Sequence, residues 1–121
     1  RCVPHRDWQQ RIEDILAAVR RIQEHVSGSD FGAFARDAKV VDAVLYQIVV
    51  IGEAARQVPD EVTSRYVDVP WLEMRDMRNV VTHAYFGVSL DIVWQTVVRD
   101  LPPLVDALGR VLEAERSQGE A

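Results

Sequence analysis

Apolar residues recur three and four positions apart along most of this chain, and this spacing most limits what the chain can fold into. Residues 7–26 form the first such stretch, with apolar side chains at Ile12, Ile15, Leu16, Val19, Ile22 and Val26. This period turns one side of a helix toward a core. We predict a long helix here, with Asp7 as its N-cap and Ser27-Gly28-Ser29 as its end.

A second predicted helix covers residues 38–57 and stops before Pro59. Its apolar positions follow the same period, at Val41, Val44, Leu45, Ile48, Ile51 and Ala55. The run from Ile48 to Ile51 is β-branched and alone would suggest a strand, but its flanks are helical and no partner strand is evident. Apolar residues nearly encircle the segment, which predicts a place at the centre of a bundle or additional burial in a dimer.

Two further helical segments are expected before residue 90. Residues 60–66 are short and polar, and fit one or two helical turns. Pro70 suits the first position of a helix over residues 70–85, which Gly87 ends.

A last apolar stripe follows Ser89, the predicted cap, and continues to about residue 114. Pro102 and Pro103 are expected to kink this run or split it. Short loops between long helices place neighbouring helices antiparallel. We therefore predict an all-α, up-and-down bundle of four to five antiparallel helices.

The composition is that of a globular protein, with 48% apolar and 27% charged residues among 121. We expect one domain over residues 1–121, with frayed ends at 1–6 and 115–121. Cys2 is the only cysteine, which excludes an internal disulfide and fits a reducing cytoplasm. No apolar run approaches the roughly 20 residues that cross a bilayer, and no secretory signal, metal-ligand spacing or phosphate-binding glycine loop is present. We expect no membrane association, metal or cofactor.

The formal net charge is −5, which argues against a protein that coats nucleic acid through a basic surface. If the chain binds RNA, a local basic patch must contact the phosphates. Arg75 with Arg78 is one candidate patch, and Arg110 is another.

The octet Arg78-Asn79-Val80-Val81-Thr82-His83-Ala84-Tyr85 contains a cation, a carboxamide, an imidazole and a phenol. Such groups can hold a phosphate, move a proton near neutral pH and present a hydroxyl. On a helix, Arg78 and Tyr85 fall nearly on one line, and Asn79 and His83 are neighbours one turn apart. Arg78 and His83 lie at the two sides of this polar face, so one copy makes a loose site. By itself, an arginine and a histidine on one helix more often belong to a surface or interface than to a catalytic site.

Glu53 is a charged residue in the otherwise apolar second helix. It could pair with Arg75 or Arg78 across the bundle and orient the site, or form a structural buried ion pair.

The sequence resembles the HepT-like branch of the HEPN family, whose members are toxin partners of minimal nucleotidyltransferases in prokaryotic toxin–antitoxin pairs. That branch has the motif Arg-x4-His-x-Tyr, which Arg78, His83 and Tyr85 meet here. Other matching blocks are Arg11-Ile12-Glu13-Asp14-Ile15-Leu16, Ile51-Gly52-Glu53-Ala54-Ala55, Pro70-Trp71, Met77-Arg78-Asn79, Tyr85-Phe86-Gly87-Val88 and Trp94 with Asp100-Leu101-Pro102. The similarity spans residues 7–114. Ala84 departs from the glycine that is usual in this branch.

The resemblance implies a homodimeric bundle in which two copies of Arg78 and His83 face one cleft. It implies a type VII toxin that cleaves cellular RNA, tRNA or mRNA, without a metal. The partner nucleotidyltransferase is then expected to neutralise the toxin by transferring AMP to Tyr85.

The expected chemistry uses the 2′-hydroxyl of RNA as the nucleophile. His83 suits proton transfer, and Arg78 can hold the phosphate oxygens. Asn79 can orient His83 or contact the phosphate, and Tyr85 can contact RNA or accept AMP. Two other functions fit the residues: a non-catalytic helical binding module that assembles with a nucleotidyltransferase, and a plain helical scaffold.

Overall fold

The structure is a computed structural model that describes residues 5–86 and 89–120. The side chains of five of these residues lie outside the description: His5, Arg6, His83, Tyr85 and Glu120. Every regular element in the described ranges is helical, so the all-α prediction is confirmed. No helix in these ranges is long and apolar enough to cross a membrane.

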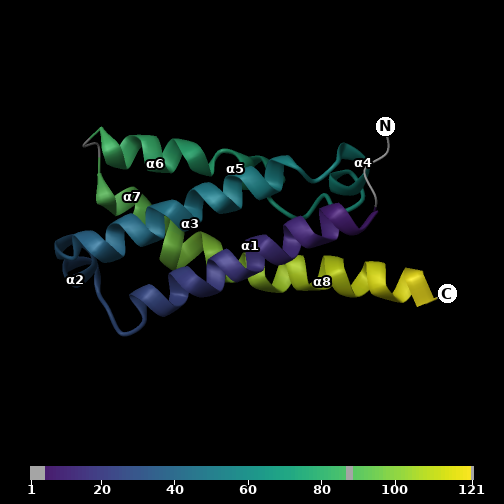
Figure 1. Cartoon of the computed structure of the whole chain (residues 1–121), viewed down its shortest axis with the longest axis horizontal. Helices are drawn as coiled ribbons and strands as arrows, with labels where there is room; N and C mark the ends of the chain where they lie inside the picture. Colours follow the sequence, from purple (N-terminus) through teal and green to yellow (C-terminus); the bar gives the residue numbers. More distant parts are fainter. Residues whose placement is uncertain (1–4, 87–88, 121) are drawn as a thin grey trace.

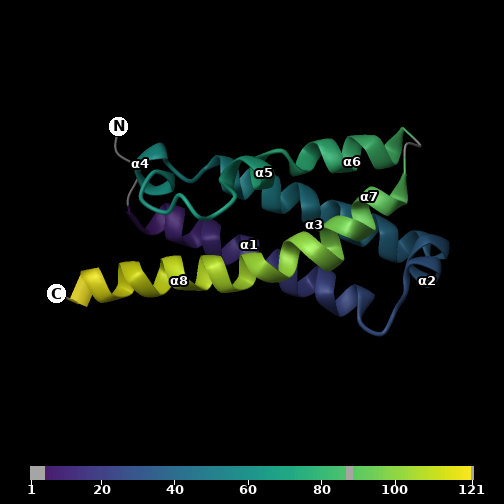
Figure 2. The same ribbon diagram turned by 180° about the vertical axis from the view of Figure 1, so that it is seen from behind.

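The helices form a bundle around α3 (Figures 1 and 2). In chain order they are α1 His5–Val26, α2 Phe31–Arg36, α3 Ala38–Arg56, α4 Asp60–Thr63, α5 Trp71–Arg75, α6 Met77–Tyr85, α7 Leu90–Gln95, the π-helix η1 Thr96–Asp100 and α8 Leu101–Glu120. Helices α5 and α6 follow one side of α3, and α1 follows the other with α8 beside it. The chain reverses direction from α1 to α3 and again from α3 to α6, as expected for an up-and-down arrangement.

The core gathers around α3, as its apolar circumference predicts. Its buried residues are Val41, Val44, Leu45, Gln47, Ile48, Ile51, Gly52, Ala54 and Ala55. The β-branched run from Ile48 to Ile51 is helical, which confirms the helix over the strand. Helix α1 contributes Ile12, Ile15, Val19 and Ile22, each fully buried. It ends at Val26, and Gly28 follows with φ +75°, a conformation that favours glycine.

Two predicted helix starts have different outcomes. Ser89 caps α7 as expected, because its Oγ accepts a hydrogen bond from the backbone N–H of Asp91 at 2.9 Å. Asp7 is not the cap of α1, since the helix begins at His5 and Asp7 lies in its first turn. A carboxylate is favourable there as well, because it faces the positive end of the helix dipole.

The helix predicted over residues 70–85 is two helices, with a break at Asp76. The backbone N–H of Asn79 donates to the Asp76 carbonyl at 2.9 Å, three residues back, so the ladder leaves the α pattern there. As a result, α5 ends at Arg75 and α6 begins at Met77. Gly87, the predicted end of this segment, lies outside the described residues.

The two prolines after η1 change the type of helix. A proline ring has no N–H to donate and clashes with the carbonyl four residues before it. The turn before Pro102 and Pro103 is a wider π turn, in which the Leu101 N–H donates to the Thr96 carbonyl five residues back. The helical run therefore continues into α8, which reaches Glu120. Fraying of the chain ends stays a prediction.

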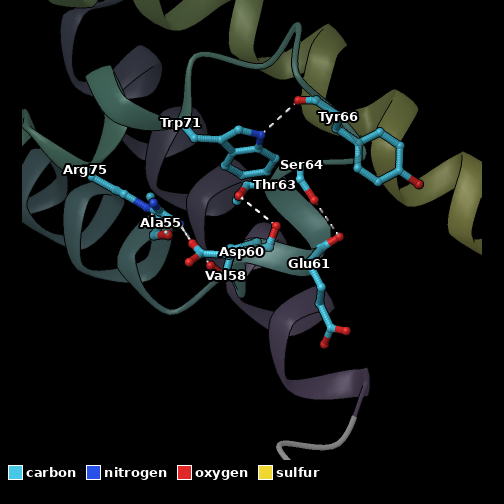
Figure 3. A network of polar contacts seen from close by, with 9 residues as sticks. All are labelled: Ala55, Val58, Asp60, Glu61, Thr63, Ser64, Tyr66, Trp71 and Arg75. Atoms are coloured by element: carbon cyan, nitrogen blue, oxygen red, sulfur yellow. Dashed lines mark hydrogen bonds and ion pairs between the residues drawn. The ribbon is translucent and has the colours of Figure 1, made fainter.

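The loop between α4 and α5 is fastened to the bundle by polar contacts (Figure 3). Trp71 Nε1 donates to the Tyr66 carbonyl at 2.9 Å, and the Tyr66 hydroxyl donates to the Glu115 carboxylate on α8. Burial, and then this hydrogen bond, raise the pKa of Tyr66 above its ordinary value of 10.0. The loop that precedes α5 is therefore tied to α8.

Candidate active site on helix α6

Helix α6 has one buried side and one exposed side. Met77 and Val81 are buried against the core, whereas Arg78, Asn79 and Thr82 are exposed. This division confirms the amphipathic helix that the sequence predicts. The backbone of α6 brings His83 and Tyr85 into its last turn, and their side chains lie outside the described residues.

The end of α5 and the start of α6 pass over Gly52 of α3. A Cβ atom added to this buried residue would lie 3.4 Å from the Met74 carbonyl oxygen and 3.7 Å from Cγ of Arg78, which are ordinary van der Waals distances. The aliphatic stem of Arg78 therefore lies close to Gly52. Sequence reasoning gave Gly52 no role, although a glycine inside a long buried helix costs roughly 1 kcal/mol and needs a packing reason.

Glu53 pairs with Arg78, which is one of the two partners that the sequence allows. Oε1 of Glu53 lies 3.6 Å from a terminal guanidinium nitrogen of Arg78, and the two side chains are 48% and 54% exposed. The pair is therefore exposed, and the buried structural ion pair that the sequence also allowed does not form. An exposed pair contributes about 0–1 kcal/mol to stability. Glu53 can therefore orient the guanidinium of Arg78 and still give it up to a phosphate.

The model of the family described as ribonuclease HepT-like matches residues 15–111. This chain belongs to that family. The matched region contains α3 and α6 entire, and thus Gly52, Glu53 and the octet from Arg78 to Tyr85. The prediction that the chain is a member of a ribonuclease family is confirmed.

Curated relatives resemble the HepT-like chain over most of its length. "Probable ribonuclease HepT" of Thermococcus cleftensis is 37% identical over 83% of this chain and 88% of its own length. "Putative RNase TTE0752" of Caldanaerobacter subterraneus subsp. tengcongensis is 32% identical, over 87% of this chain and 94% of its own length. A two-function protein of Methanocaldococcus jannaschii, "Gamma-glutamylcyclotransferase and putative RNase MJ0434", is 31% identical over 89% of this chain and 49% of its own length. No solved structure was found to match.

In this HepT-like chain Arg75 does not share the surroundings of Arg78. Its Nε donates to the Ala55 carbonyl at 3.3 Å, and a terminal nitrogen donates to the Val58 carbonyl at 3.0 Å (Figure 3). The same nitrogen lies 3.9 Å from Asp60. Arg75 thus satisfies carbonyls at the C-terminal end of α3, where a cation is favourable. Arg78 instead pairs with Glu53, so the two arginines of the predicted basic patch have different partners.

We expect Arg75→Met to lower the free energy of unfolding by about 1–3 kcal/mol, because two carbonyls at the end of α3 lose their charged donor. Urea unfolding followed by circular dichroism measures this change. Arg56→Met is the matched control, since Arg56 is an exposed arginine at the end of the same helix, and should change stability little. If Arg75→Met instead abolished RNA cleavage at unchanged stability, Arg75 would act on RNA as the sequence suggests.

The exposed face of α3 continues the surface around Arg78 in this HepT-like chain. Tyr46, Val50 and Glu53 follow one another at spacings of four and three, so they share one side of the helix. Tyr46 is 66% exposed and Val50 is partly buried. An exposed tyrosine and a partly buried valine thus lie on the same side of α3 as Glu53. Among the described residues no His, Cys, Asp and Glu side chains gather as a metal site would require.

Proposed function

We propose that this chain is an RNA endonuclease, the toxin of a type VII toxin–antitoxin pair, and that Arg78 and His83 carry the cleavage of tRNA or mRNA. One observation supports this most. Arg78 is exposed, pairs with Glu53 and precedes His83 by five residues on one helix, in a family described as ribonuclease HepT-like. The groups proposed for phosphate binding and proton transfer thus lie on the same helix.

The proposed reaction is transfer within the RNA. A base removes the proton of the 2′-hydroxyl, the 2′-oxygen attacks the adjacent phosphorus, and the bond to the 5′-oxygen breaks. An acid then protonates the leaving 5′-oxygen, and a 2′,3′-cyclic phosphate remains. An imidazole titrates near neutral pH and serves either step. The guanidinium of Arg78 stabilises the charge that builds on the non-bridging oxygens, and Asn79 orients His83 or contacts the phosphate.

A second copy of the chain completes the proposed site. On an α-helix, residues 78 and 83 differ by about 140° around the axis, so one copy separates the two groups. Two copies related by a two-fold axis supply two arginines and two histidines, with one imidazole as base and the other as acid. The exposed Tyr46 and the partly buried Val50 on the Glu53 side of α3 support this arrangement, because a partner copy could cover both side chains.

The proposed control of the toxin is AMP transfer to Tyr85 by a minimal nucleotidyltransferase partner. Tyr85 lies two turns after Arg78 on the same helix. An added AMP places bulk and negative charge beside the arginine that must bind an anionic substrate. AMP on Tyr85 would therefore block RNA binding directly, without a change of fold.

The test is to express the wild type and His83→Ala without any partner, and to compare growth and RNA integrity. We expect the wild type to slow growth and degrade RNA, and His83→Ala to do neither. His25→Ala is the control, because His25 is exposed at the end of α1, away from α6. Equal RNA patterns in wild type and His83→Ala would refute the nuclease and leave the non-catalytic binding module.

A further inference from the structure

A groove of about 490 Å³ lies along the side of α6 that carries Met77 and Val80, between α5–α6 and η1–α8. Its floor is apolar and consists of Met74, Met77, Val80 and Leu104. Met74, Met77 and Leu104 are almost fully buried, so these side chains belong to the core and form a firm base. The size falls in the range of pockets that bind ligands or side chains of a partner, about 300–1,000 Å³.

The rim of this groove is acidic. Glu73, Asp76 and Asp100 are exposed around it, and Arg99 is the one cation among the described residues that line it. No described cation lies within 4.0 Å of any of the three carboxylates. The rim therefore repels RNA phosphates and attracts a basic ligand, which separates this surface in chemistry from that of Arg78.

The π-helix η1 builds one wall of the groove. Its wider turn, set by Pro102 and Pro103, places Thr96, Arg99 and Asp100 along the lining. Such turns cost helical regularity and often occur at functional sites. The Asp100-Leu101-Pro102 block, which the RNA chemistry leaves without a role, thus contributes an acid to the rim.

The groove and the Arg78 surface use different sides of α6. On a helix, Met77 and Val80 lie about 100° and 160° around the axis from Arg78. An occupant of the groove therefore leaves the arginine uncovered. Val80 and Tyr85 are five residues apart, which is about 7.5 Å along the axis. They also differ by about 140° around the axis, because Tyr85 falls nearly on the line of Arg78. A protein that docks in the groove therefore reaches Tyr85 only if it extends around the last turn of α6.

We propose that this groove docks a basic amphipathic segment of a protein partner, in which an apolar side chain fills the floor and flanking Lys or Arg residues meet the acidic rim. The identification of that partner as the nucleotidyltransferase rests on the function proposed above. Docking in the groove anchors the enzyme beside α6, from where it extends around the last turn to its target tyrosine. The groove is then the recognition site for modification, separate from the site of RNA cleavage.

The test measures binding of a synthetic 14-residue helical peptide of Leu and Lys, with Leu on one face, to the full chain by calorimetry. We expect Glu73→Gln with Asp100→Asn to weaken binding at least tenfold. The control is Asp42→Asn with Asp106→Asn, which removes the same charge at exposed positions outside the groove, and should change affinity less than twofold. A peptide with Glu in place of Lys should not bind.

Three results would overturn the proposal. Equal weakening by both double variants would mean general attraction to an acidic chain. Displacement of the peptide by a short RNA would make the groove an RNA surface, and a changed molecular mass in the groove variant, measured by light scattering, would make it an interface between copies. The groove variant should still degrade RNA like the wild type, because it retains Arg78 and His83. If the chain is not a nuclease, RNA cleavage is absent from the wild type as well. If the groove is not the docking site, Glu73→Gln with Asp100→Asn binds the peptide as tightly as the wild type does.

Discussion

Arg78→Ala is expected to lower the rate of RNA cleavage by at least about 100-fold, the effect of removing one preorganised donor from a developing oxyanion. The guanidinium is the permanent cation of the proposed site, and half of the side chain is open to an anionic substrate. The loss should appear mainly in kcat, because charge on the phosphate is greatest in the transition state. A fluorescent RNA oligonucleotide under single-turnover conditions measures it.

The fold should survive this substitution, because an exposed ion pair such as that with Glu53 contributes at most about 1 kcal/mol. Circular dichroism and urea unfolding verify this. Arg56→Ala is the matched control and should cleave like the wild type. Arg78→Lys separates charge from geometry, since lysine keeps the charge but loses the planar two-point contact. Wild-type cleavage by Arg78→Ala would remove this residue from the mechanism.

Much of the fold follows from periodicity in the sequence. All six predicted apolar positions of α3 are buried, and so are four of the six in α1, because a helical stripe three to four residues apart has to meet a core. The other two, Leu16 and Val26, are partly buried. The polar face of α6 is also predictable, since the phase within one unbroken helix is fixed by geometry. The family resemblance is the second source of information, and it alone connects the octet with RNA.

Other features depend on the tertiary structure. The break at Asp76 has no glycine or proline to mark it, so a continuous helix was the natural prediction. The sequence also does not show that Arg75 donates to carbonyls at the end of α3. Glu53 has two possible partners in the sequence, and the packing of α6 on α3 pairs it with Arg78. Long-range choices of this kind leave no local pattern.

Tyr85→Phe is expected to abolish transfer of AMP to the chain while RNA cleavage continues. Phenylalanine keeps the ring but lacks the hydroxyl that would attack the α-phosphate of ATP and displace pyrophosphate. Without that acceptor, co-expression with the nucleotidyltransferase should no longer rescue growth. Mass spectrometry of the purified chain measures the change, as the loss of the AMP adduct.

Tyr46→Phe is the matched control for this experiment. Tyr46 is 66% exposed on α3, so accessibility alone would allow its modification. The Tyr46→Phe variant should keep a full AMP adduct, because the proposed docking groove lies beside α6 and directs the enzyme to the end of that helix. An adduct that persists in Tyr85→Phe and disappears in Tyr46→Phe would move the acceptor to α3. Loss of RNA cleavage in Tyr85→Phe would instead place the phenol in contact with RNA, and control of the toxin would then need another acceptor.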